Sequence, residues 1–211
     1  MSAPPPEQKF QRRKEERPAE IMAAGLKIFA EKGFAAARLE EVAEAAGVSK
    51  ATIYLYFESK TELFTAIVKD IATPRFDDIE RLLDSYDGTS GDLLAFTIGK
   101  LREIATGTEL PALAKIILAE SANFPEIRTF YRDHIILRGF GNLARVIERG
   151  IERGEFRDCN VDAAVQEIIF PILMNTLARS TFGDLPQLDP DGFFTAHAEF
   201  VARGLATDRE A

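Results

Sequence analysis

The sequence predicts an all-α protein in which a small N-terminal domain of three helices is joined through a long fourth helix to a larger helical bundle. Apolar residues recur at helical spacing from Pro18 almost to the end of the chain, and no segment keeps the two-residue alternation of a half-buried strand. Glycine, proline and short polar stretches divide this pattern into about nine helices. Within residues 39–60, small residues stand where two short helices must cross closely.

The first fourteen residues are predicted to be a disordered basic tail. They contain three consecutive prolines and few apolar residues, and Arg12, Arg13 and Lys14 make their end basic. Two roles remain open for this tail, a solubilising segment or an arm that touches DNA phosphates or the minor groove. The helical period begins at Pro18, with Met22, Leu26 and Phe29 on one face and Gly33 as a C-terminal stop.

A helix-turn-helix is predicted over residues 38–57, with short helices at 40–46 and 50–56. Ala43 supplies a small side chain at the crossing, Gly47 can adopt positive φ in the turn, and Ile53 anchors the second helix. Ser49 is placed to cap that second helix through its hydroxyl. The first helix lacks a Ser or Thr cap, because Ala37 and Arg38 precede it.

A fourth helix is predicted to start at Ser59, where Glu62 completes a capping box. Pro74 should bend or end this helix, yet the apolar period continues to Leu83, so a kinked long helix is expected. We therefore divide the chain into a helix-turn-helix domain over 15–75 and a bundle over 76–211. Further helices are expected near 92–106, 110–122, 125–153, 161–181 and 190–206.

Composition indicates a soluble cytoplasmic protein. Apolar residues make up 46% and charged residues 28%, the single cysteine excludes an internal disulfide, and the uninterrupted apolar runs are too short to span a membrane. The net charge of −8 is unevenly distributed, since residues 1–70 carry eleven cationic and eleven acidic side chains. The acidic excess thus belongs to the bundle, and phosphate binding by the N-terminal domain would depend on a few placed cations.

An enzyme is not expected, and neither is a cofactor or a metal. The two histidines, His134 and His197, lack the Glu-x-x-His pattern of di-iron bundles, and no Walker loop or Gly-x-Gly-x-x-Gly occurs. Cys159 has no histidine near it in the sequence.

The runs IMAAGLKIFAEKGF and LEEVAEAAGVSKATIYLYFESKTELF resemble the TetR family of bacterial transcriptional regulators over about residues 17–68. The resemblance implies that the second short helix approaches base edges, that two tyrosines contact phosphates, and that a lysine anchors the backbone. The candidate DNA-binding residues are Arg38, Ser49, Lys50, Ala51, Thr52, Tyr54, Tyr56 and Lys60. Leu55 stands where polar or aromatic residues are common in the family, and it either touches a thymine methyl or packs internally.

The hypothesis is a ligand-responsive repressor that binds a palindromic operator on double-stranded DNA as a homodimer and is released by a small, largely apolar effector. The last two helices are the expected dimer interface, through Val165, Ile168, Ile169, Ile172, Phe193, Phe200 and Val201. The expected ligand pocket is lined by Phe96, Leu113, Ile117, Glu120, Phe124, Arg128, Tyr131, His134, Phe170 and Asn175. The alternative is a helical ligand- or protein-binding module that has lost specific DNA binding.

Overall fold

The structure of the chain is a computed structural model that describes residues 6–107, 110–183 and 189–207. Its contacts divide the chain into two compact units. The head unit comprises Met1–Asp70 and Ile116–Arg128, and the bundle unit comprises Ile71–Lys115 and Thr129–Ala211. The sequence placed its boundary after residue 75 and assigned all later residues to the bundle, so the return of 116–128 to the head was not anticipated.

The head begins with a longer helix than predicted. Helix α1 spans Pro6–Lys32 and runs through Pro18, so residues 6–14 are helical and the predicted disorder is wrong there, while residues 1–5 lie outside the described part. Apart from Phe10, residues 7–17 are glutamine, lysine, arginine and glutamate, which are strong helix formers despite their polarity. Pro18 has no amide N–H, so α1 lacks one backbone hydrogen bond at this position, but the helix continues through it.

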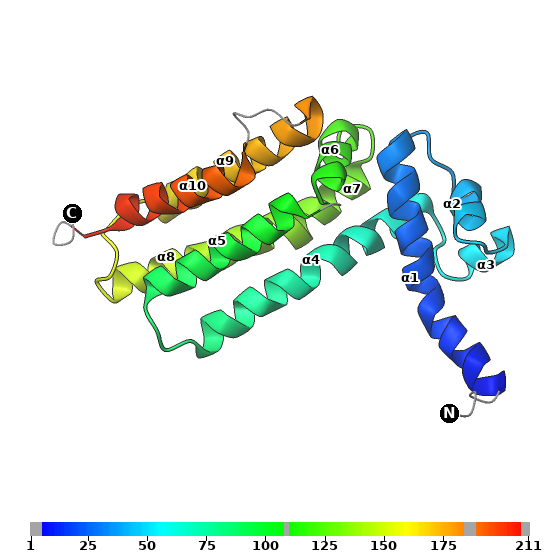
Figure 1. Ribbon diagram of the computed structural model, residues 1–211, viewed down its shortest axis with the longest axis horizontal. Helices are drawn as coiled ribbons and strands as arrows, with labels where there is room; N and C mark the ends of the chain where they lie inside the picture. The colour runs from blue at the N-terminus through cyan, green and yellow to red at the C-terminus, as the bar shows by residue number, and fades with distance from the viewer. Residues whose placement is uncertain (1–5, 108–109, 184–188, 208–211) are drawn as a thin grey trace. The chain divides into compact units, whose positions relative to one another are not determined.

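The helix-turn-helix is formed by α2 (Leu39–Ala45) and α3 (Lys50–Tyr54), which lie beside α1 in Figure 1. Gly33 ends α1 at φ +77°, and Gly47 takes φ +65° in the turn between α2 and α3. Both angles belong to the left-handed region in which glycine costs least. The predicted roles of these two glycines are therefore confirmed.

Helix α4 spans Lys60–Ser85 and continues through Pro74. Its start is capped as predicted, because the Glu62 amide donates to Ser59 Oγ over 3.1 Å. The Glu62 carboxylate accepts from the Glu58 amide at 2.6 Å, one residue earlier than a standard capping box. Because α4 continues to Ser85, Pro74 does not end the helix.

Aromatic side chains form the centre of the head. Phe29, Phe34 and Phe64 are fully buried, and their ring centroids lie 5.3–5.5 Å apart. Phe124 joins this cluster from the segment between α6 and α7, with its ring edge-on to Phe34 at 4.8 Å. Such T-shaped pairs add to the stabilisation from burial, and they explain why residues 116–128 pack with the head.

The remaining helices confirm the all-α prediction, and no strand occurs in the described ranges. Helix α5 spans Ser90–Thr106 and α6 Leu110–Glu120. The predicted helix 125–153 is one helical stretch made of α7 (Pro125–Tyr131), a π-helical segment (Arg132–Ile136) and α8 (Leu137–Glu152). Helices α9 (Val161–Phe182) and α10 (Pro190–Leu205) complete the bundle.

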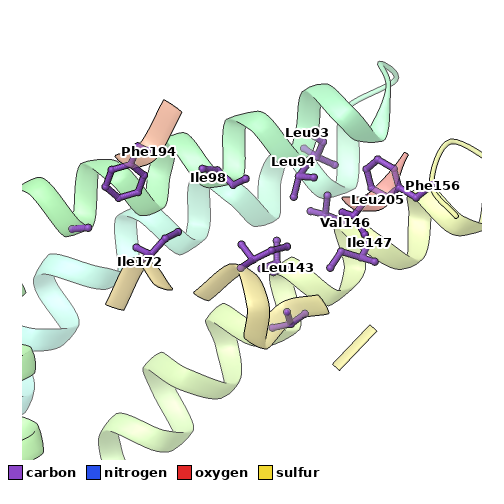
Figure 2. Close-up of a cluster of buried hydrophobic side chains, with 13 residues drawn as sticks. Leu93, Leu94, Ile98, Leu143, Val146, Ile147, Phe156, Ile172, Phe194 and Leu205 are labelled. Carbon is purple, nitrogen blue, oxygen red and sulfur yellow. The ribbon is translucent and has the colours of Figure 1, made fainter. Parts of the chain in front are cut away.

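The core of the bundle unit lies among α5, α8, α9 and α10, where α5 packs beside α8 and α9 beside α10 (Figures 1 and 2). Its buried centre includes Leu93, Ile98, Leu143, Ile147 and Phe194. By length and composition, α9 is apolar enough to cross a membrane. The apolar residues on its inner face belong to this core, and polar residues interrupt the apolar run in its sequence.

Candidate nucleic-acid interface

The outward face of α3 carries four exposed side chains in two neighbouring rows. Lys50 and Tyr54 form one row, four residues apart, and Ala51 and Leu55 form the other. On the opposite face, Ile53 is completely buried, so the orientation of the helix in the head is fixed. Three of the predicted DNA-binding residues, Lys50, Ala51 and Tyr54, are thereby presented to solvent together with Leu55.

The N-terminus of α3 is capped by Ser49, as predicted. Ser49 Oγ accepts a hydrogen bond from the Thr52 amide at 3.0 Å and lies 2.8 Å from the Thr52 hydroxyl. The half-buried Thr52 side chain is therefore part of the cap. This pairing fixes the first turn of the helix that carries the exposed rows.

Lys50 is held by an acidic side chain of α2. Its ammonium lies 2.6 Å from Glu40 Oε1. Hydrogen bonding to Lys50 holds the pKa of Glu40 below its usual range, and the same contact raises the pKa of Lys50. This pair could not be predicted from the sequence, because the two residues lie on different helices across the turn.

Lys60 does not point freely outward, in contrast to the phosphate anchor implied by the family resemblance. Its Nζ donates to the carbonyl oxygens of Phe34, Ala35 and Ala37 at 2.9, 2.8 and 3.3 Å. It also lies 4.7 Å from the centroid of the Phe34 ring. All three ammonium protons therefore have acceptors in the turn between α1 and α2, whose backbone carbonyls lie outside both helices.

Arg38 and Tyr56 flank the exposed rows. Arg38 is the exposed N-cap residue of α2, and its amide donates to Glu41 Oε2 at 3.2 Å. The Glu41 carboxylate thus supplies the return half of a capping box, which accepts from the amide of the N-cap residue. Lys32 binds its other oxygen at 2.6 Å. Tyr56 is half-buried.

The ten residues predicted to line a ligand pocket divide between the two units. Glu120 and Phe124 are engaged in the head, where the Glu120 carboxylate accepts from the Ala35 amide at 3.3 Å. Among the bundle residues, Phe170 is half exposed, and the exposed His134 ring lies 4.8 Å from the Phe130 ring in a tilted arrangement. Ile117 and Arg128 belong to the head, and the others to the bundle, namely Phe96, Leu113, Tyr131, His134, Phe170 and Asn175.

A cavity of about 350 Å³ lies in the bundle between the first half of α5 and the last half of α10. None of the ten predicted residues lines it, and its wall is rich in small side chains such as Ala95, Ala198 and Ala202. Tyr131, one of the predicted pocket residues, does not line this cavity, and burial raises the pKa of its phenol. The small-residue repeats on α5 and α10 were the available sequence signal for this cavity.

The predicted dimer residues are only partly outward-facing. Val165, Ile168 and Ile172 are buried in the core of the bundle, which contradicts their assignment to a dimer face. Phe200 is 74% exposed, as an interface residue in a free subunit should be. Large apolar side chains that sequence analysis did not assign to the interface are also exposed on α9, namely Phe170, Met174 and Phe182.

Two family models match this chain, one in its N-terminal part and one in its C-terminal part. Residues 21–67 match the model for bacterial regulatory proteins of the tetR family. Residues 87–187 match the tetracyclin repressor-like C-terminal domain. The two matches cover the helix-turn-helix and most of the bundle.

Individual relatives are distant but nearly full-length. The fatty acid metabolism regulator protein of Bacillus subtilis is 27% identical over 176 residues, which are 81% of this chain and 88% of the relative. The structure of FadR from Bacillus subtilis with stearoyl-CoA covers 89% of this chain and 98% of its own, with 24% identity and a TM-score of 0.72. A transcriptional regulator from Saccharomonospora viridis, solved with choline, covers 92% and 99% with 21% identity and a TM-score of 0.77.

Proposed function

The chain belongs to the TetR family of DNA-binding transcriptional regulators, and from that premise we propose that it is a homodimeric repressor of a palindromic operator, released by an apolar effector. The observation that carries this proposal is the outward face of α3. It presents Lys50, Ala51, Tyr54 and Leu55 together on a helix whose other face is locked into the head.

A dimer is required because one short helix offers too few contacts for specific binding. Two copies related by two-fold symmetry would place their α3 helices in successive major grooves, about 34–36 Å apart or somewhat more. The exposed apolar side chains of α9 and α10, namely Phe170, Met174, Phe182 and Phe200, are the surface that supports such an interface.

For the effector we propose a fatty acyl thioester. Support comes from the fatty acid metabolism regulator of Bacillus subtilis and from the stearoyl-CoA complex of FadR, both of which align with most of this chain. An acyl chain is the apolar ligand that a helical bundle can enclose without unpaired polar groups. The acyl thioester must bind the DNA-free conformation more tightly, since only differential affinity shifts a population.

The proposal is tested by a protection footprint of the full-length chain on the DNA upstream of its own gene. We expect a protected palindrome, a dimer mass in solution at micromolar concentration, and a steep fall in affinity with salt. Stearoyl-CoA should then release the DNA at fixed salt, whereas coenzyme A alone and choline should not. A flat salt dependence without a footprint would favour a helical module without DNA-binding function, and a monomer mass would exclude the dimer.

A further inference from the structure

The side chain of Leu55 is unusually exposed for a leucine in a packed protein. It is 82% exposed, more than any other large apolar side chain in the part of the chain that the structure describes. Its position at the end of α3 places it on the outward face of the head. Because it contributes almost no burial within its own unit, folding does not account for the side chain.

The backbone around Leu55 is nevertheless well defined. Leu55 continues the helical turn at φ −73° and ψ −21°, and its amide donates to the Thr52 carbonyl at 3.1 Å. Two residues before and two residues after it, Ile53 and Phe57 are buried, and the Phe57 amide donates to the Ile53 carbonyl at 2.9 Å. The leucine side chain is thus held outward by buried neighbours on both sides.

Leu55 and Ala51 form an apolar row next to the polar row of Lys50 and Tyr54. The polar row can donate to phosphates or base edges, whereas a leucine has no donor or acceptor for either. The major groove offers one apolar group, the C5-methyl of thymine, which apolar side chains contact in known readout. The partner that suits Leu55 is therefore a methyl group on a base.

We propose that Leu55, with Ala51 beside it, determines specificity by reading a thymine methyl in each operator half-site. This inference rests on the proposed function, because it requires α3 to enter the major groove. It specifies thymine at one position of each operator half-site. Burial of one methyl group corresponds to about a four-fold change in affinity, and a dimer that loses two should bind about sixteen-fold more weakly.

The test begins with selection of duplexes from a randomised pool by the full-length chain. Each thymine of the selected half-site is then replaced by deoxyuridine, which removes only the methyl group and preserves pairing. We expect one symmetrical pair of replacements to weaken binding by about sixteen-fold in the wild type. In Leu55→Ala the same replacement should have little effect, and the variant should bind the thymine duplex as weakly as the wild type binds the deoxyuridine duplex.

The matched control is Leu118→Ala, which truncates another exposed leucine of the head unit away from α3 and should retain the full deoxyuridine effect. An unchanged melting temperature in Leu55→Ala would show that the effect is not a folding defect. The inference is overturned if no deoxyuridine replacement weakens wild-type binding, or if the loss is equal in wild type and Leu55→Ala. Failure to enrich any duplex would instead refute the proposed function itself.

Discussion

Replacing Lys60 by methionine tests whether this lysine holds the head together or contacts DNA. Its ammonium donates to the carbonyls of Phe34, Ala35 and Ala37. Methionine keeps the length and apolar body of the side chain but removes its charge and all three donors. The structure therefore predicts a loss of stability, whereas a phosphate anchor predicts a loss of electrostatic DNA affinity.

The magnitude follows from the three contacts. A buried hydrogen bond to a charged group contributes about 1.5–3 kcal/mol, and exposed ones contribute less. Two of the three contacts are partly buried and one is exposed, so we expect a combined loss of about 3 kcal/mol, including the weak attraction to the Phe34 ring. In a chain of this size that loss lowers the melting temperature by roughly 6–12 °C.

The assay combines thermal unfolding with a salt titration of DNA binding, performed well below the melting temperature of the variant. If Lys60 serves only inside the head, the slope of log affinity against log salt stays as in the wild type. If it contacts a phosphate, the slope falls by about 0.9 per contact and about 1.8 per dimer. Lys27→Met, an exposed lysine of α1, is the control and should leave both measurements unchanged. A normal melting temperature with a reduced slope would refute our reading of Lys60.

Three further predictions concern helix capping, close packing and pH. Ser49→Ala removes the cap of α3 and should lower the free energy of unfolding by about 1 kcal/mol in urea titrations, with weaker operator binding. Gly150→Ala would place a Cβ only 2.1 Å from the Phe156 ring, so calorimetry should show a loss of about 1–3 kcal/mol. The Arg138 guanidinium holds the pKa of Glu80 below its usual 4.5, so this stabilisation is present above that pH and is lost as the pH falls through the lowered value. Unfolding in urea between pH 3 and 6 should therefore depend less on pH in Arg138→Gln than in the wild type.

The sequence was most informative where one residue type serves one local purpose. Gly33 and Gly47 stop and turn the chain, Ser49 and Ser59 cap helices, and the structure places all four in those roles. Helix periods were also readable, because each helix buries a single apolar face. Local chemistry of this kind depends on neighbours within four residues, so it can be derived without knowledge of the fold.

Contacts between distant segments were beyond the same reasoning. The contacts of Lys60 with the turn between α1 and α2 span more than twenty residues, and nothing in the sequence around Lys60 distinguishes a carbonyl partner from a phosphate. Likewise, apolar residues on α9 fit both a core and a dimer face by period alone. The structure assigned Val165 and Ile168 to the core and left Phe170 and Met174 outside.

The balanced charge of residues 1–70 can be understood from contacts within the head. Lys50 is paired with Glu40, Lys32 with Glu41, and Lys60 with backbone carbonyls. Any phosphate that approaches must compete with a partner already present, which weakens the sequence-independent attraction that dominates non-specific binding. Contacts to base edges do not carry this penalty, and an apolar contact such as that proposed for Leu55 is insensitive to salt. The ratio of specific to non-specific affinity, which decides how a regulator finds its site among competing DNA, should therefore rise because Lys32, Lys50 and Lys60 are restrained.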